Sequence, residues 1–305
     1  MNAGSVQLPP VGLRPTFSKK VFLGGLPPDI DERQLNHCFS SFGKHRIDWP
    51  HKNDTHYQFP PKGYAFVIFE KASSVVNLLS RCVIIRGKFI IALSSLSVRN
   101  KEVQVRPWLL SDCFYICAPA PIPDHRLTVF VGGVPRPTTA AQLAALMQAN
   151  FGCVLQVTID VDSAFLYPRG SARVRFAFRH SYMAAVGKRF VRFNNGEQQK
   201  NLEIKPFVAD EPKCDKCGRA EAKFCGSLNC LSYYCTKCWE LRHDEEVHEP
   251  LVVESRRSRR AKKLQKSPSP STACQTPSKS GTASTSSTPV DVNLVYSLAK
   301  LNVCF

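Results

Sequence analysis

The sequence has no apolar run that approaches the roughly 20 residues needed to cross a bilayer. Residues 1–15 also lack the continuous apolar core of a signal peptide. These two absences predict an intracellular chain in a reducing compartment. The 13 cysteines are therefore not expected to form a disulfide framework.

Acidic residues are comparatively few, with 24 Asp and Glu against 41 Lys and Arg, for a formal charge of +17. This imbalance favours a polyanionic partner, either nucleic acid or an anionic membrane. The sequence shows no paired catalytic carboxylates and no nucleophile with a base, and its Gly-Gly pairs lack the GxGxxG spacing of a phosphate loop. We therefore expect a binding protein that is not an enzyme and has no small-molecule substrate.

Two stretches of the chain nearly repeat each other. VFLGGLP at 21–27 and VFVGGVP at 129–135 each begin as an apolar strand that Gly-Gly and Pro then break. A helix pattern follows each stretch, starting at Asp31 in the first copy and at Thr138 or Thr139 in the second, and stopping at a glycine. The strands are offset by 108 residues and the glycine stops by 109, which indicates two copies of one domain.

Each copy then returns to strand patterns around a second helix. The first copy predicts strands at 46–49, 64–69 and 102–105 with a helix at 72–81, and the second predicts strands at 154–160, 172–178 and 202–207 with a helix at 181–190. The order β-α-β-β-α-β predicts an α+β, ferredoxin-like fold for both copies, with both helices on one face of the sheet and the other face open.

Aromatic side chains of the first copy are expected on that open face. Strand side chains alternate between faces, so if the small aliphatic residues of KGYAFVIF (62–69) pack on the helices, Phe22, Tyr64 and Phe66 lie on the open side. Bases of single-stranded RNA stack on such rings, with about 1–3 kcal/mol per base. Lys62, at the entry of the strand, is placed to meet phosphate.

These residues resemble the RNA-recognition motif. KGYAFVIF matches the longer signature of that motif at every position, and VFLGGL resembles the shorter one. The alternative is that a partner protein or an extra helix covers the rings.

The second copy is less complete. It keeps Phe130, but RGSARVRF (169–176) places Ser171 and Arg173 at the two stacking positions. Because an arginine plane stacks on a base, Arg173 is expected to substitute in part. The alternative for this copy is a positioning domain with little affinity for RNA.

The segment after the second copy has the spacing C-x2-C-x7-C-x4-C-x4-C-x2-C-x4-H-x4-H. Eight ligands fill two tetrahedral zinc sites and leave no open position, so the two Zn²⁺ ions are predicted to be structural, not catalytic. A module of about forty residues builds little core, so the metal must supply stability. Spacing leaves open whether alternate or neighbouring ligand pairs share an ion. The predicted ligands are Cys214, Cys217, Cys225, Cys230, Cys235, Cys238, His243 and His248.

Two further segments differ in composition from the domains. The linker contains APAPIPD, which resists helix and suggests a stiff spacer. The tail begins with the basic cluster RRSRRAKK (256–263) and continues as Ser/Thr/Pro-rich sequence, which predicts disorder. The cluster adds phosphate contacts, acts as a nuclear localisation signal, or is merely solvated. The predicted boundaries are a disordered N-terminus at 1–17, the first motif at 18–108, the linker at 109–126, the second motif at 127–209, the zinc module at 210–253 and the tail at 254–305.

Two RNA-recognition motifs followed directly by a ZZ-type zinc finger resemble the cytoplasmic polyadenylation element-binding proteins. KVFLGGLPPDI (20–30), PPKGYAFVIFE (60–70), KEVQVRPW (101–108) and YPRGSARVRF (167–176) are similar to that family, as is the run from Cys214 to Leu251. Only about 18 residues precede the first motif, where family members usually have a long disordered region.

The resemblance implies binding to U-rich, UUUUA(U)-type elements in the 3′ untranslated regions of messenger RNA, and control of poly(A) tail length and translation. It implies translation-control and polyadenylation proteins as partners, no membrane partner, and a cytoplasmic location with passage through the nucleus. It also favours a cross-brace, in which one ion is held by Cys214, Cys217, Cys235 and Cys238 and the other by Cys225, Cys230, His243 and His248.

Three other functions remain open from the sequence: a nuclear RNA-processing factor, a RING-like ubiquitin ligase, and a protein-interaction scaffold. RING domains usually place a histidine in the middle of the motif, whereas both histidines come last here. The intact KGYAFVIF segment argues against the scaffold.

Overall fold

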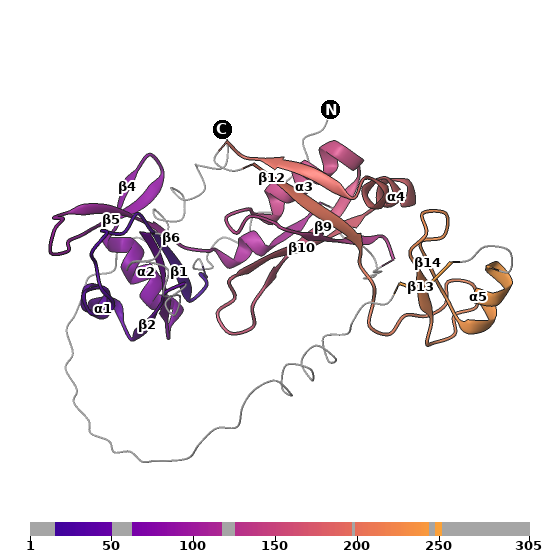
Figure 1. The fold of residues 1–305 in the computed structure, drawn as a ribbon, viewed down its shortest axis with the longest axis horizontal. Coiled ribbons are helices and arrows are strands. Elements are labelled where there is room, and N and C mark those ends of the chain that lie inside the picture. The colour runs from indigo at the N-terminus through magenta and orange to yellow at the C-terminus, as the bar shows by residue number, and fades with distance from the viewer. Residues whose placement is uncertain (1–15, 51–62, 118–125, 197–198, 244–247, 252–305) are drawn as a thin grey trace, which may run out of the picture. The chain divides into compact units, whose positions relative to one another are not determined.

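The computed structural model describes residues 16–50, 63–117, 126–196, 199–243 and 248–251. The chain divides into two compact units, of which the first contains two six-stranded sheets and the second a small hairpin-and-helix module (Figure 1). The predicted α+β class is confirmed. Within the described residues, no helix has the length and apolar character needed to span a membrane.

The first sheet follows the predicted β-α-β-β-α-β order, with a hairpin added before the last strand. Its spatial order is β2-β3-β1-β6-β5-β4, and α1 and α2 cover one face (Figure 1). The elements are β1 (Lys20–Gly24), α1 (Glu32–Phe39), η1 (Ser40–Phe42), β2 (His45–Asp48), β3 (Tyr64–Phe69), α2 (Ala72–Arg81), β4 (Val83–Ile85), β5 (Lys88–Leu93) and β6 (Lys101–Arg106).

Helix starts follow the local sequence signals closely. Asp31 caps α1 and accepts from the Gln34 amide while the Gln34 side chain accepts from the Asp31 amide, which is a complete capping box. Thr139 and Gln142 repeat this arrangement at the second copy. The sequence left Thr138 and Thr139 as alternatives, and the structure selects Thr139.

The core of the first sheet lies between the strands and the two helices. The alternation predicted for β3 is confirmed on its inner face, where Ala65, Val67 and Phe69 are buried. They pack with helix residues such as Leu35 and Leu78, so the other side chains of β3 point away from the helices. Of these, Phe66 and Ile68 are buried and Tyr64 is half-buried.

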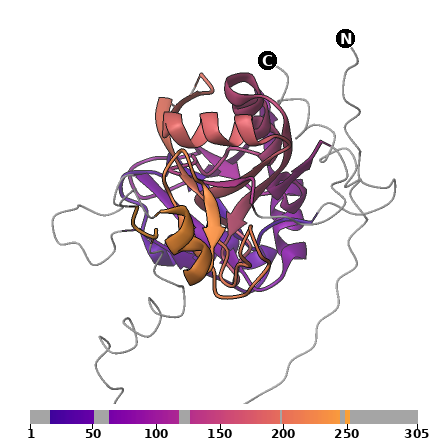
Figure 2. The ribbon, with the colours of Figure 1, turned by 90° about the vertical axis from the view of Figure 1, so that its right-hand side faces the viewer.

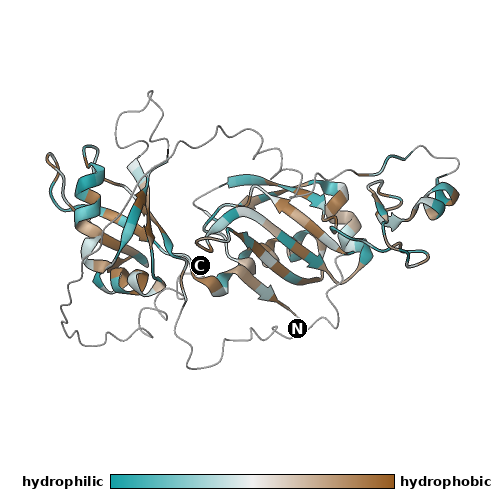
Figure 3. Ribbon diagram, turned by 90° about the horizontal axis from the view of Figure 1, so that it is seen from below, coloured by the Kyte–Doolittle hydropathy of each residue, from teal (hydrophilic) through white to brown (hydrophobic). Residues whose placement is uncertain are grey.

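The second sheet repeats the β-α-β-β-α-β plan, with a single strand in place of the β4–β5 hairpin and one added strand at the other edge. Its order is β11-β12-β8-β10-β9-β7, and apolar and polar bands alternate along its strands (Figure 3). The edge strand β7 comes from the predicted linker and pairs with β9. The elements are η3 (Leu110–Cys113), β7 (Phe114–Ile116), β8 (Thr128–Gly132), α3 (Ala140–Phe151), β9 (Val154–Val161), β10 (Pro168–Phe176), α4 (Arg179–Lys188), β11 (Phe190–Asn194) and β12 (Gln199–Pro206).

The structure differs from the sequence prediction mainly in short strands. Strand β10 begins at Pro168 and ends at Phe176, and α4 is two residues earlier than expected at both ends. The predicted spacer contains β7, whereas APAPIPD lies outside the described residues. Three-residue strands carry too little alternation to be recognised and form because a neighbouring strand pairs with them.

The second unit holds the predicted zinc module. A two-stranded hairpin, β13 (Lys223–Cys225) and β14 (Ser232–Tyr234), is followed by α5 (Thr236–Arg242). Figure 2 shows α5 beside this hairpin. The predicted disordered tail from 254 onward lies outside the described residues.

Candidate nucleic-acid interface and metal centre

The three aromatic rings predicted for the first open face lie together. The Phe22 ring centroid is 5.6 Å from those of Tyr64 and Phe66, and the latter two are 6.1 Å apart. The strand register explains this cluster, because Phe22 pairs directly with Phe66 and Gly24 pairs with Tyr64.

Glycine at position 24 allows the Phe22 ring to lie along the strand. A Cβ on Gly24 would stand 2.7 Å from Cε1 of Phe22, so any larger residue would force the ring away. The next glycine, Gly25, has a φ of 79°, a left-handed conformation that ends the strand, and its amide donates to the Gly63 carbonyl. The Gly-Gly pair therefore determines both the position of the Phe22 ring and the turn that follows β1.

Two of the three rings are open, and the third is covered. Phe66 is only 7% exposed. The Lys20 ammonium lies 4.2 Å from its centroid, and the Tyr167 ring meets it edge-on at 5.8 Å. Phe22 and Tyr64 are half-buried. The Phe22 and Tyr64 rings are therefore accessible for base stacking without rearrangement of this sheet.

Cations that the sequence motifs did not indicate border the ring cluster. The Arg106 guanidinium lies 5.5 Å from the Phe22 centroid, and Arg106 pairs with Phe22 across the β1–β6 ladder. Lys20 forms a 2.5 Å ion pair with Asp48. The strand-end positions of Lys20 and Arg106, on the same face as Phe22, were the signal that could have identified them. Lys62 lies outside the described residues, and its phosphate contact remains a prediction.

The second open face carries one central ring and several polar groups. Phe130 is half-buried, and a Cβ on Gly132 would lie 3.4 Å from its ring, the same ring-over-glycine arrangement as in the first copy. Arg173 donates through Nε to Asp160 at 3.2 Å, and Ser171 donates to the same carboxylate at 2.7 Å. The carboxylate thus holds Arg173 against the sheet, and the stacking role of this residue stays a prediction.

The predicted metal ligands form two separate clusters in the second unit. Within each cluster, one ligand atom from every residue lies within 4.8 Å of the others. The grouping is the cross-brace that the family resemblance favoured: Cys214, Cys217, Cys235 and Cys238 in one cluster, and Cys225, Cys230, His243 and His248 in the other.

The hairpin and α5 place these ligands. Cys225 ends β13, Cys235 is the N-cap of α5, and His243 is its C-cap. The Sγ of Cys230 lies 3.3 Å from Nε2 of His243, whose Nδ1 lies 3.1 Å from the Trp239 carbonyl. That second contact fixes the imidazole plane and leaves Nε2 facing the thiols, as expected for a ligating histidine.

Backbone amides favour the charged form of some of these thiols. Burial opposes ionisation of Cys214, but hydrogen bonds from the backbone of Cys235, Cys217 and Lys216 outweigh it and lower the pKa of Cys214 to about 6. The neighbouring thiols raise the pKa of Cys238 to about 12, chiefly through its hydrogen bond with Cys235. A site that gathers four thiols while stabilising thiolate suits a divalent cation.

Both clusters fit Zn²⁺. One donor set consists of four cysteines and the other of two cysteines with two histidines, and both are tetrahedral zinc sets. Cys214, Cys225, Cys230 and Cys235 are buried, and the small core of the module is built largely from ligands and their neighbours Tyr234 and Trp239.

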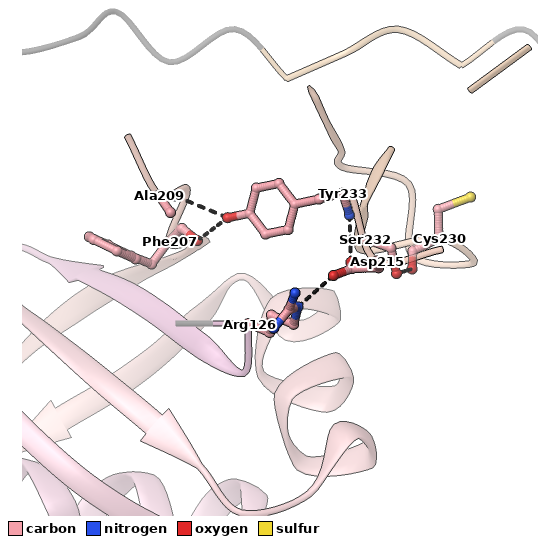
Figure 4. Close-up of polar contacts among 7 residues, drawn as sticks. All are labelled: Arg126, Phe207, Ala209, Asp215, Cys230, Ser232 and Tyr233. Atoms are coloured by element: carbon pink, nitrogen blue, oxygen red, sulfur yellow. Dashed lines mark hydrogen bonds and ion pairs between the residues drawn. The ribbon is translucent and has the colours of Figure 1, made fainter. Parts of the chain in front are cut away.

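A polar network holds the hairpin within the second unit (Figure 4). Arg126 donates to Asp215 at 2.5 Å, and Asp215 also accepts from the Tyr233 amide at 2.7 Å. The Tyr233 hydroxyl accepts from the Ala209 amide at 3.0 Å and lies 3.4 Å from the Phe207 carbonyl. Tyr233 is 3% exposed, so this network fixes the hairpin that carries Cys225 and Cys230.

Two protein-family models match this chain. One, described as the RNA recognition motif, matches residues 18–107. The other, described as the cytoplasmic polyadenylation element-binding protein ZZ domain, matches residues 200–254.

The chain is also similar to curated proteins. The translational regulator orb2 of Drosophila melanogaster is 44% identical over 247 residues, covering 78% of this chain and 35% of the relative. Cytoplasmic polyadenylation element-binding protein 1 of Caenorhabditis remanei is 40% identical over 270 residues, covering 80% of this chain and 46% of the relative. The chain therefore spans less than half the length of these relatives.

Among solved structures, the Sex-lethal RNA recognition domains 1 and 2 from Drosophila melanogaster match 62% of this chain and 99% of that one, at 23% identity and a TM-score of 0.22. That similarity is too low to support an argument. The order of the modules, the two family models and the curated relatives agree, and they show that this chain belongs to the cytoplasmic polyadenylation element-binding protein family.

Proposed function

We propose that this chain binds single-stranded RNA on its open sheet faces, with the first motif as the principal site. One observation carries the proposal: Phe22 and Tyr64 form a half-exposed aromatic pair, 5.6 Å apart and tilted by 30°, at the centre of a sheet. The rings take no part in the core between that sheet and its helices. Arg106 lies beside Phe22, so a cation borders the stacking surface.

Rings and cations in this arrangement match the two chemical features of a single-stranded nucleic acid. Each base presents a flat π-face to an aromatic side chain, and each phosphate presents a negative charge to Lys or Arg. The formal charge of +17 supports the electrostatic part. Double-stranded nucleic acid is a poorer match, because its bases are already stacked on each other.

The sequence preference and the cellular role are supported by family membership. On that basis the RNA is a U-rich element of the UUUUA(U) type in a 3′ untranslated region. Binding there regulates cytoplasmic polyadenylation and translation in concert with translation-control and polyadenylation proteins. The chain acts by recruiting these proteins and not as an enzyme. The proposed location is cytoplasmic, with passage through the nucleus.

The metal clusters supply structure in this proposal. Two Zn²⁺ ions, one in each cluster, hold the module folded, and all four positions of each ion are filled by protein ligands. Such ions have no open position for substrate, so the module presents a rigid surface and performs no reaction. Metal analysis of the purified chain is expected to give two zinc ions per chain.

RNA titration tests the proposed function. Purified chain is titrated against fluorescent UUUUAU and CCCCAC at one fixed, near-physiological salt concentration, because phosphate attraction alone mimics affinity at low salt. Tyr64→Ala is expected to weaken UUUUAU binding about 5- to 150-fold, the loss of one stacked base. Tyr64→Phe keeps the ring and should retain most of the affinity.

Phe178→Ala provides the matched control. Phe178 is 51% exposed at the N-cap of α4 in the second motif, where its ring stacks on His180 with the centroids 5.4 Å apart. Its loss should leave UUUUAU binding unchanged. Equal binding of both oligonucleotides that persists in Tyr64→Ala would contradict the proposal, and would indicate contact through basic residues only.

A further inference from the structure

The strand β7 gives the second sheet a feature that the first sheet lacks within the described residues. It pairs antiparallel with β9, with Phe114 opposite Thr158, Tyr115 opposite Val157 and Ile116 opposite Gln156. The first sheet ends at β2, the strand that corresponds to β9, without a further partner among the described strands. The linker therefore widens only the second sheet.

Alternation along β7 decides which side chains reach the open face. Val157 is fully buried toward the helices, and Tyr115, opposite it, is half-buried on the same side, where β7 packs against α3. Phe114 and Ile116 consequently point to the open face. They are 58% and 60% exposed and lie two residues apart on the same face, so they form a small contiguous apolar surface.

The same pairing places these side chains in line with arginines. Arg173 of β10 pairs with Thr158 of β9, which pairs with Phe114, so the three form one row across the sheet. The next row runs from Arg175 through Gln156 to Ile116. Neighbouring strands are about 4.8 Å apart, so each row joins a cation to an apolar side chain about 10 Å away.

We propose that β7 is part of the RNA-binding face of the second motif, and that Phe114 stacks on a base of the bound strand. This inference rests on the proposed function and assigns a site within it. Continuity with the open face and the arginine at the other end of each row favour a nucleotide strand over a protein partner, because phosphate needs the cation and a base needs the ring.

The second motif is short of rings without this addition. Its two other stacking positions hold Ser171 and Arg173, and Asp160 binds both. Phe130 is thus the central ring of this sheet, and Phe114 supplies another at its edge. The second motif then reaches a base beyond its own β-α-β-β-α-β sequence, using residues of the linker.

Phe114→Leu tests the inference, since leucine keeps an apolar side chain but removes the π-face. Phe178→Leu is the matched control, because Phe178 is 51% exposed at the N-cap of α4, outside the strands of the same sheet. With a U-rich 14-mer, Phe114→Leu is expected to weaken binding by the value of one stacked base, about 5- to 150-fold. Phe178→Leu should stay within about two-fold of the unmodified chain.

Two further readouts separate stacking from a structural role. The salt dependence of 14-mer affinity should be the same in Phe114→Leu as in the unmodified chain, because a ring neutralises no phosphate. Phe114→Trp should keep the affinity, and its added indole fluorescence should be quenched by RNA. A changed salt slope, or an indole that RNA leaves unquenched, would overturn the stacking role.

Failure of the inference differs from failure of the proposed function. If the unmodified chain prefers the U-rich 14-mer over a C-rich one and Phe114→Leu binds it equally well, only the role of Phe114 is refuted. If the unmodified chain shows no such preference, the proposed function fails and the inference fails with it. An unchanged affinity accompanied by a change in oligomeric state would assign Phe114 to a protein contact and overturn the inference.

Discussion

Substitution of Phe66 by leucine separates the two roles that aromatic residues have on the first sheet. All three rings of the cluster belong to positions typical of RNA stacking, yet Phe66 is 7% exposed. We expect Phe66→Leu to reduce stability more than RNA affinity. Tyr64→Leu should do the reverse, because Tyr64 is half-buried and open on one side.

The contacts of Phe66 set the size of the effect. Its ring lies 5.6 Å from Phe22, 5.8 Å from Tyr167 and 4.2 Å from the Lys20 ammonium. Aromatic pairs contribute about 0.5–1.5 kcal/mol each, and a partly exposed cation–π contact about 0.5–1 kcal/mol. These contributions are not additive, so the expected loss in the free energy of unfolding is about 2–3 kcal/mol. For Tyr64→Leu, which loses two ring pairs of a half-exposed side chain and no cation contact, it is smaller, about 1–2 kcal/mol.

Hydrogen exchange of the β1 and β3 amides measures local stability in a chain of several domains, where one unfolding transition is not expected. RNA affinity is measured on the same samples, at a temperature at which every variant is folded. Phe66→Leu should lose protection and keep UUUUAU affinity within about three-fold, against about 5-fold or more lost in Tyr64→Leu. Equal losses of affinity with unchanged protection would refute the reasoning and would mean that Lys20 and Tyr167 move aside when RNA binds.

Three other outcomes follow from the site geometry. Cys230→Ser should release both zinc ions and expose the module to protease, because the ligand pairs of the two clusters interleave along the chain. Binding of one ion contributes about 10–16 kcal/mol, as much as the stability of a whole domain. Cys153→Ser is the control, because Cys153 is exposed outside the module, and metal analysis should find both ions retained. Asp160→Asn should raise affinity for a U-rich 14-mer about 3- to 5-fold in titration, since it removes a negative charge from the open face of the second motif. Weaker binding would show that the carboxylate holds Arg173 in the position that binds RNA. Gly24→Ala should displace the Phe22 ring and weaken UUUUAU binding about 5-fold, because the added Cβ would lie 2.7 Å from that ring. Gly132→Ala should have a smaller effect in the same assay, because its Cβ would lie 3.4 Å from the Phe130 ring.

Local signals were sufficient to predict most of the fold. Asp31 and Thr139 each cap a helix through a complete capping box, and β3 and α2 have the predicted bounds. These features depend on residues within a few positions of one another. The strand β7 depends on pairing with the distant β9, so its own residues do not indicate it. The β4–β5 hairpin is local, with a tight turn at Arg86 and Gly87, and is a signal that the sequence prediction missed.

In the candidate site, too, the sequence predicted which residues take part but not the long-range contacts between them. Alternation along β3 predicted the face of Phe66, but its cover by Lys20 and Tyr167 comes from contacts across the sheet and across 101 residues of sequence. Spacing identified all eight metal ligands but not their grouping, which depends on how the β13–β14 hairpin brings Cys225 and Cys230 to the histidines. Long-range geometry therefore decides how locally predicted residues are used.

The two motifs share one backbone design but present different chemistry. Both place a ring over a glycine in the first strand, so that stacking position is common to them. The strand that carries the longer signature differs, because Tyr64 and Phe66 of β3 correspond to Ser171 and Arg173 of β10. A face that relies on arginine binds RNA with steeper salt dependence than one that relies on rings, since only the cation displaces counterions. Rising salt should therefore weaken contacts to the second motif first and leave the Phe22–Tyr64 site as the last point of attachment.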